Sequence, residues 1–313
     1  MFTIPRRKLA TSAVLCSAAL FGTTGTVLVN APEQADAWSV GAIRLLIGAL
    51  TLAAVARWRG GELRAPWRPA PRAAAGQWGT PWNTLVGAVG VAVFQLGYFL
   101  SVERTGVAVG TVVTIGSGPV LSGIITALLE RRPPERRWVV GTAISITGVA
   151  LLGLFGRQLD TDLLGILLAV LAGLGWAVFA TVGKRHIDAG IDSTASMASV
   201  FGGGAVLLSP VLLWHSPRWF ATPSGLLVGL YLGVVTVGVA YTLYGFALRH
   251  LRAPTVITLT LLEPITAALL GVVVVHESIS PAGWMGIAMV LLGLGITVRT
   301  TTAEHEATAT VAA

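Results

Sequence analysis

The residue with the clearest capacity for chemistry is a carboxylate in the middle of an apolar segment. Residues 259–275 have the sequence LTLLEPITAALLGVVVV, with Glu263 directly before Pro264. A carboxylate in a bilayer core costs on the order of 2.5 kcal/mol or more if it stays ionised and unpaired, so it must carry a proton or face a polar group. Two interpretations of Glu263 are open: a site for a substrate ammonium or a proton, and a helix-break cap bonded to nearby hydroxyls or to Arg44.

Further polar and aromatic residues lie inside apolar segments. Cavities that bind small organic molecules are mostly apolar and aromatic with a few polar groups, and this set fits that pattern. For each ring, aromatic packing is the competing explanation. Arg44, the only basic residue inside a predicted span, lies about two turns from its outer end, so substrate binding and snorkelling both explain it. The substrate- or proton-binding candidates are Glu263, Gln95, Tyr98, Tyr241, Tyr244, Trp176 and Arg44.

The elements that must position these residues are membrane-spanning helices. Only 11% of the 313 residues are charged, against about a quarter in a soluble domain. Apolar stretches of about 20 residues, long enough to cross a bilayer, recur along the chain without the alternation of barrel strands. Since lipid offers the backbone no hydrogen-bond partners, we predict an all-α membrane protein. Its ten predicted transmembrane helices are 9–29, 38–56, 83–102, 106–129, 138–156, 163–183, 193–214, 225–248, 254–275 and 282–298.

Lysine and arginine are distributed unequally over the two sides of these spans. One side holds 17 of them and the other holds 3. Because basic loops stay in the cytoplasm, we predict that both termini are cytoplasmic. The net charge of +7 comes from these scattered loop residues, which form no basic stripe interleaved with aromatic residues. We therefore expect the lipid bilayer, and no nucleic acid, as a partner.

The chain repeats itself with an offset of 145 residues. Spans one to five match spans six to ten, and because each half holds five helices, the second copy must enter the membrane from the opposite side. Such inverted repeats are typical of alternating-access transporters, whose sites lie near the midplane between the halves. The predicted units are residues 9–156, residues 163–298 and a disordered cytoplasmic tail at 299–313. The residue pairs that share the offset are Pro119 and Pro264, Gly141 and Gly286, and Gly148 and Gly293.

The two prolines predict a break in one helix of each repeat. Pro264 has no amide hydrogen and disfavours helical geometry at Glu263, so it should start a second half-helix with Glu263 near its positive end. The equivalent segment, TIGSGPVLSG, has glycines beside its proline. We predict two interrupted helices that cross near the midplane. The helix-break and gating candidates are Gly116, Gly118, Pro119 and Pro264.

These motifs resemble a known family. The stretch LLEPITAALLGVVVVHES, the glycine-rich final span and the Gly-Pro break in span four resemble the EamA family of the drug/metabolite transporter superfamily. The likeness covers about residues 9–298. It implies a carrier of the inner cell membrane, often an exporter, that moves amino acids, other small metabolites or drugs through a cavity between the repeats.

In one respect the chain departs from this family. Its members often have a Gly-Glu pair about thirteen residues after the mid-helix proline. Here the second repeat has Glu277 after His276, and the first repeat has Arg132 at that position, with Glu130 two residues earlier. The resemblance therefore does not assign the role of the family's first-repeat acid to Glu130.

The leading prediction is therefore a secondary-active inner-membrane exporter of small metabolites or amino acids that works by alternating access. No GxxxxGK[ST] loop is present, so we expect a substrate or ion gradient, with proton coupling as one form, to supply the energy. The alternative is an exporter or flippase of drugs or lipid-like amphiphiles with the same fold.

A membrane-embedded enzyme is the remote alternative. The five histidines are dispersed through loops and tail, and neither HExxH nor GxSxG occurs. We predict no enzymatic activity, no cofactor and no metal site. A glycine face formed by Gly225, Gly229 and Gly233 could close either a contact between repeats or a homodimer.

Overall fold

The structure, a computed structural model, describes residues 6–68, 80–154, 162–276 and 278–311. Within these ranges the chain folds into helices and contains no strand. The count of basic residues on the two sides included Arg72 and Arg157, and the family comparison used Glu277. These three residues lie outside the described residues. The α-helices are α1 (Arg6–Leu28), α2 (Ala37–Trp58), α3 (Thr80–Glu130), α4 (Arg136–Leu154), α5 (Leu163–Asp188), α6 (Ser193–Leu208), α7 (Val211–Trp214), α8 (Pro223–Leu230), α9 (Ala240–His250), α10 (Ala253–Leu259), α11 (Glu263–Leu270) and α12 (Pro281–Val311).

Shorter segments of tighter or wider helix interrupt or join these elements. The 3₁₀ turns are η1 (Ala65–Trp67), η2 (Arg218–Ala221) and η4 (Thr260–Leu262). The π-helical segments are η3 (Tyr231–Val239) and η5 (Gly271–Val275). Span eight is therefore built from α8, η3 and α9, and span nine from α10, η4, α11 and η5.

The described residues form ten helical spans. Nine stretches among them are long and apolar enough to cross a membrane, and one of these is Pro81–Glu130. That stretch holds two spans, because the backbone leaves the helix at Gly106, with φ 77° and ψ 163°. The Tyr98 and Thr111 hydroxyls hydrogen-bond at 3.0 Å across this turn, although they are 13 residues apart and would lie about 20 Å apart along a straight helix. Only glycine takes such a φ without strain.

Contacts between α4 and α12 show that the two repeats run in opposite directions. A Cβ atom added to Gly148 would lie 2.6 Å from the carbonyl oxygen of Gly286, and the reverse distance is the same. Gly141 and Gly293 meet in the same reciprocal way. Low numbers on α4 thus face high numbers on α12, so these equivalent helices are antiparallel. The predicted inverted repeat is confirmed, and its glycines let the backbones approach closely.

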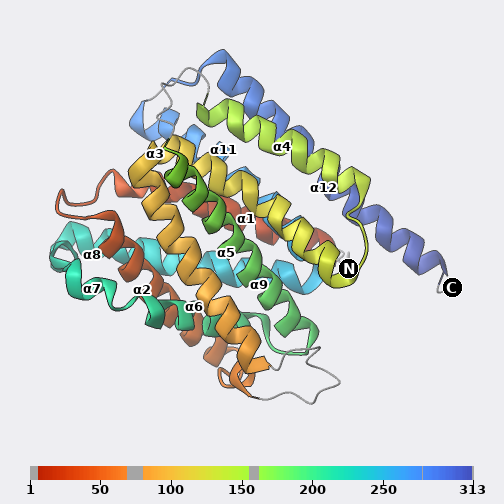
Figure 1. Cartoon of the computed structure of the whole chain (residues 1–313), viewed down its shortest axis with the longest axis horizontal. Helices are drawn as coiled ribbons and strands as arrows, with labels where there is room; N and C mark the ends of the chain where they lie inside the picture. The colour runs from red at the N-terminus through yellow and green to blue at the C-terminus, as the bar shows by residue number, and fades with distance from the viewer. Residues whose placement is uncertain (1–5, 69–79, 155–161, 277, 312–313) are drawn as a thin grey trace, which may run out of the picture.

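The remaining helices pack in pairs that cross from one repeat to the other. In Figure 1, α4 and α12 lie side by side along one edge of the bundle. The hairpin α3 packs on α5, α2 packs on α6 and η3, and α1 packs on α9 and α11. Both chain ends lie on the same side of the bundle (Figure 1). The centre of the molecule is therefore lined by helices from both halves.

Span seven was predicted at 193–214, and Ser193–Trp214 is one of the stretches long and apolar enough to cross a membrane. Within it the helix is interrupted at Ser209-Pro210 into α6 and α7, because Pro210 cannot continue the hydrogen-bond ladder. The last helix, α12, continues to Val311 and so includes most of the 299–313 segment that the sequence predicted as a disordered tail.

The glycine face of span eight closes a contact within the chain. A Cβ atom on Gly225 would meet the backbone of Trp219, one on Gly229 would meet the Phe220 ring, and one on Gly233 would meet Ile47. These glycines hold span eight against α2 and the preceding turn, so of the two roles left open above, the structure uses the face for packing inside one chain.

Candidate functional site

Glu263 is the first residue of α11, directly after the 3₁₀ turn η4. Pro264 has no amide hydrogen to offer the carbonyl of Thr260, and that carbonyl accepts from the amide of Glu263 instead. The second half-helix predicted at Pro264 is therefore present. The predicted departure of Glu263 from helical geometry is wrong, since its φ is −50° and its ψ is −52°. The 3₁₀ turn compensates for the missing amide, so Glu263 stays helical.

The equivalent break in the first repeat does not occur. Gly116, Gly118 and Pro119 all lie inside α3, which is interrupted only at Gly106. The Cβ atom of a residue before proline normally clashes with the proline ring, but Gly118 has none, and the helix continues. Gly118 also packs on α5, where an added Cβ atom would lie 2.8 Å from the Trp176 ring. The prediction of two interrupted helices is thus correct only for span nine.

Helix α1 contacts the backbone exactly where span nine changes its winding, and Gly22 makes this possible. A Cβ atom on Gly22 would lie 2.7 Å from the carbonyl oxygen of Glu263 and 3.1 Å from the amide nitrogen of Ala267. The start of α11 is therefore fixed against a helix of the first repeat by main-chain contact.

Charged and phenolic groups from four spans meet around Glu263. Arg44 on α2 and Glu263 interact electrostatically with each other, and both act on the hydroxyls of Tyr98 and Tyr241. Within the part of the chain that the structure describes, no ion pair joins Arg44 to Glu263, and the Arg44 Nε atom is buried without a hydrogen-bond partner. The two opposite charges thus face the same region without neutralising each other by contact. We refer to these four residues as the charged cluster.

The members of the charged cluster differ in exposure. Glu263, Tyr98 and Arg44 keep an intermediate accessible area. Tyr241 closes one side of this region and is only 5% exposed.

The other predicted site residues lie around the charged cluster and differ in their hydrogen bonding. Gln95 is buried and donates to the Gly41 carbonyl oxygen at 3.5 Å, which ties span three to α2. Trp176 and Tyr244 are buried, and the Trp176 Nε1 and Tyr244 Oη atoms interact with each other, although without the geometry of a full hydrogen bond. The Tyr244 ring lies 5.5 Å from that of Tyr241. Trp176 and Tyr244 thus form a wall behind the cluster.

Sequence reasoning missed the phenylalanines that connect these rings. Phe201 packs on Tyr241 with ring centroids 4.1 Å apart, and Phe21 packs on it from α1 at 5.0 Å. Phe94 lies 6.4 Å from Tyr98 and 6.1 Å from Trp176. The spacing of Phe94 and Tyr98, one helical turn apart, was a usable signal. Phe21 and Phe201 stand alone in their segments and gave none.

Comparison with known proteins decides the family. The family model described as the EamA-like transporter family matches the chain twice, over residues 8–154 and 163–299. The chain belongs to the EamA-like transporter family. The double match also supports the repeat independently of the helix contacts. The chain is a multi-pass membrane protein, and its curated relatives are named as transporters, so an EamA transporter is a better description than an enzyme.

Individual relatives are similar along most of this EamA chain. It is 36% identical over 281 residues to the uncharacterized transporter YwfM of Bacillus subtilis, covering 90% of both chains. It is 27% identical over 222 residues to the threonine/homoserine exporter RhtA of Escherichia coli K12, covering 67% of this chain and 70% of RhtA. A solved crystal structure superposes with a TM-score of 0.77 at 19% identity, covering 94% of this chain and 98% of the other, which shows a shared fold.

Ion pairs connect the ends of the helices that cross near the cluster. At one end of this EamA bundle, Arg252 before α10 pairs with Glu130 at the end of α3. Glu130, the acid displaced by two residues from the family position, therefore links span four to span nine. At the other end, Arg104 pairs with Asp162 at 3.0 Å. The Arg104 hydrogen bond, together with backbone amides at the start of α5, lowers the pKa of Asp162.

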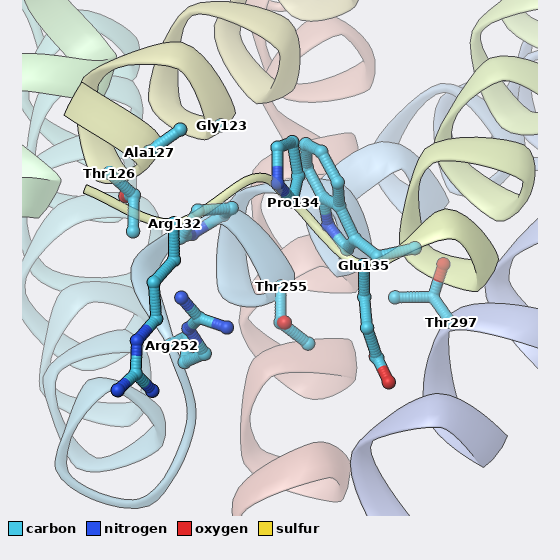
Figure 2. Close-up of a pocket in the computed structure, with 11 residues that line it drawn as sticks. Gly123, Thr126, Ala127, Arg132, Pro134, Glu135, Arg252, Thr255 and Thr297 are labelled. Atoms are coloured by element: carbon cyan, nitrogen blue, oxygen red, sulfur yellow. The ribbon is translucent and has the colours of Figure 1, made fainter. Parts of the chain in front are cut away.

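Cavities occur at the ends and sides of the bundle. One of about 30 Å³ lies between α3, α4, α10 and α12 (Figure 2), and one of about 230 Å³ adjoins it at Thr126 and Arg252. An apolar groove of about 490 Å³ lies between α2, η1, α3 and α6. Glu263 lines none of these three. Among the described residues, no group of three or more histidine, cysteine, aspartate or glutamate side chains could hold a metal ion.

Proposed function

We propose that this EamA protein is a secondary-active exporter of small zwitterionic metabolites, amino acids above all, and that the charged cluster binds them. The observation that carries the proposal is the position of Arg44 and Glu263, a guanidinium and a carboxyl group that interact electrostatically but form no ion pair within the described residues. An α-amino acid carries a carboxylate and an ammonium group a few ångströms apart. Such a molecule can satisfy both side chains at once.

The chemistry of the surrounding side chains supports the same ligand class. A guanidinium binds a carboxylate through paired hydrogen bonds, and the partnerless Arg44 Nε is available for one of them. A carboxylate beside tyrosine rings suits an ammonium group, because it supplies charge and the rings supply their negative faces. The similarity to an exporter of threonine and homoserine agrees with this class.

Alternating access follows from the inverted repeat. Because α4 and α12 meet in a symmetric antiparallel contact, the two repeats can exchange conformations. Each exchange would open the central region to the opposite side of the membrane. In the empty carrier, Glu263 would carry a proton and release it when an ammonium group binds, so export would exchange substrate for protons. The asymmetry of basic residues supports a cytoplasmic location of both termini, as proposed for a carrier of the inner cell membrane.

The test is transport by purified protein in liposomes, with a panel of labelled amino acids and an imposed pH gradient. Wild-type protein should transport at least one zwitterion faster when the imposed pH gradient drives protons in the direction opposite to the substrate. Glu263→Gln should lose this pH dependence and keep its thermal unfolding temperature. Glu33→Gln, an exposed carboxylate outside the spans, is the matched control and should behave as wild type. Equal pH dependence in all three proteins would remove Glu263 from the coupling.

A second candidate function is export or flipping of apolar amphiphiles, favoured by the apolar groove between α2, α3 and α6. Its walls include Leu85, Val206 and Leu207, which are exposed at the side of the bundle where lipid would lie. A Cβ atom on Gly202 meets nothing within 4 Å, so Gly202→Leu would fill the groove without a clash. Loss of fluorescent-lipid translocation in this variant, with amino-acid flux unchanged, would support the amphiphile function.

A further inference from the structure

A polar site separate from the charged cluster lies at the arginine-rich end of the bundle. Its cavity of about 30 Å³ has room for roughly two water molecules, the size of a small oxyanion. Three threonine hydroxyls line it, from α3, α10 and α12. Figure 2 shows them around a space bordered by the turn that joins α3 to α4. The threonines are Thr126, Thr255 and Thr297.

Two guanidinium groups border the same cavity. Arg131 takes a left-handed conformation with φ 53°, and this turn brings Arg132 to the same side of the cavity as Arg252. In Figure 2 the side chains of Arg132 and Arg252 extend to one side of the site, while Glu135 extends to the other side of Thr255. Arg252 is partly neutralised by Glu130, whereas Arg132 forms no ion pair within the described part of the chain. Arg132 therefore offers a positive charge to an anion in the cavity, while Glu135 holds a negative charge on the other side of Thr255.

The floor of the site holds a buried donor with no acceptor. Trp138 lines the cavity and is 9% exposed, and its Nε1 atom is buried without a hydrogen-bond partner. The ring is held against α3 because Gly123 has no side chain, since a Cβ atom there would overlap the indole. A buried N–H without a partner is destabilising, and an anionic oxygen in the cavity would accept its hydrogen bond.

An apolar stripe on α3 begins beside the cavity and faces outward. Val120, Ile124 and Leu128 follow one another at four-residue steps and are 45%, 50% and 73% exposed. They lie next to Gly123 and Ala127, which line the cavity. A molecule with an anionic head in the cavity could therefore place hydrocarbon chains along this stripe.

From this arrangement we infer that the cavity binds the phosphate of an anionic phospholipid headgroup. Phosphate oxygens accept from the two guanidinium groups, the Thr126 and Thr255 hydroxyls and Trp138 Nε1, and the acyl chains lie on the stripe. The Thr297 hydroxyl already donates to the Gly293 carbonyl oxygen and only lines the wall. Basic pockets between helices at the cytoplasmic surface suit such headgroups. Occupancy would brace the turn between α3 and α4 against the start of α10, where the Glu130–Arg252 pair already joins spans four and nine.

The test compares lipid retention by purified full-length protein. Wild-type protein should retain phosphatidylglycerol over phosphatidylcholine in native mass spectrometry, and Arg132→Gln should retain about fivefold less, since one basic side chain is worth about that factor at a membrane surface. Trp138→Phe keeps the ring over Gly123 and removes only the donor, so it should show a smaller loss. Arg137→Gln, in the first turn of α4 and outside the cavity, is the matched control.

The source of the phosphate is decided by a second arm. Inorganic phosphate is added to the same proteins in neutral detergent, and thermal unfolding is followed. Stabilisation by phosphatidylglycerol but not by inorganic phosphate supports the lipid site. Stabilisation by inorganic phosphate alone, abolished in Arg132→Gln, overturns the lipid source in favour of a soluble anion. Equal phosphatidylglycerol retention by wild type, Arg132→Gln and Arg137→Gln overturns the site itself.

Discussion

The two proline-containing helices occupy equivalent places in the two repeats, yet they behave differently. In span four, Gly118 and Pro119 are buried inside a continuous helix and pack on Trp176 of α5. In span nine, Glu263 and Pro264 keep intermediate exposure and follow a 3₁₀ turn. The offset of 145 residues places Glu263 opposite Gly118 in the alignment of the halves. At this equivalent position the first repeat has a glycine packed on a tryptophan ring, and the second repeat has a carboxyl group.

The difference shows how a symmetric fold makes an asymmetric site. Inverted repeats need equivalent helices, and the antiparallel contact of α4 with α12 satisfies that need. A substrate, in contrast, must be bound by particular atoms. A residue with a Cβ atom and a carboxylate before the proline changes the winding of span nine and brings charge to it, whereas glycine does neither in span four.

The largest effect is expected when the second repeat is made like the first. Glu263→Gly removes the carboxylate and the Cβ atom together, and we expect transport to fall about 10- to 100-fold, because a charged contact is worth about 1.5–3 kcal/mol. Flux into liposomes measures the loss. Comparison with Glu263→Gln, which keeps the Cβ atom, separates charge from helix shape. Normal flux in both variants would show that the charge difference between the repeats has no role in transport.

The next effect concerns the backbone contact at the start of α11. Gly22→Ala places a methyl group 2.7 Å from the Glu263 carbonyl oxygen, so α1 and α11 must separate. Overpacking of this kind costs about 1–3 kcal/mol, and we expect a lower unfolding temperature together with reduced flux. Gly25→Ala, three residues on in α1, meets nothing within 4 Å and serves as the control. If the two variants behave alike, close contact at Gly22 does not position Glu263.

A smaller effect is expected at the matching position of the first repeat. Gly118→Ala restores a Cβ atom before Pro119 and brings it 2.8 Å from the Trp176 ring. The helix should then lose stability at the proline, with a lower unfolding temperature and a smaller change in substrate affinity than Glu263→Gly causes. Gly116→Ala, which meets only the end of Ile146 at 3.3 Å, is the control. A larger transport defect in Gly118→Ala than in Glu263→Gly would reverse the assignment of the two helices.

Much of the fold could be predicted from the sequence, because lipid imposes strong constraints on it. Length and hydropathy located the ten spans, and the start of span four was placed at Gly106, the residue whose positive φ turns the chain. The repeat offset located both members of the Gly148 and Gly286 contact. These features depend on local composition and on residues that recur at fixed spacing.

The site was harder to predict because it depends on packing between distant helices. The winding at Pro119 depends on the missing Cβ atom of Gly118 and on Trp176 of another helix, so a rule about proline alone gave the wrong answer there. Arg44 was ambiguous in sequence, since its depth fits both snorkelling and binding. Only the packing of α2 in the folded bundle brings it within electrostatic reach of Glu263. The contacts of Phe21 and Phe201 with Tyr241 likewise depend on the packing of distant helices, so the sequence did not predict them.

The smallest effect is expected at the corners that lead into the two proline helices. Arg104, before the turn into span four, pairs with Asp162, whereas Arg249, its equivalent before span nine, forms no ion pair within the described residues. Asp162→Asn keeps an oxygen to cap α5 and loses only the charge. Because this pair is exposed, we expect the unfolding temperature at pH 7 to fall by less than about 2 °C.

The pH dependence of that small difference identifies its cause. The pKa of Asp162 is lowered in the folded protein, first by the Arg104 hydrogen bond and then by backbone amides. Its contribution to stability is therefore fully present above the unfolded pKa of about 3.9 and is lost as pH falls through the lower folded value. The gap in unfolding temperature between wild type and Asp162→Asn should stay constant from pH 7 to about 5 and shrink progressively as pH falls below about 4. A gap that does not shrink below about pH 4 would mean that the asparagine cap, and not the ion pair, accounts for it. The Arg104–Asp162 ion pair, which has no equivalent at Arg249, would then contribute nothing measurable to stability.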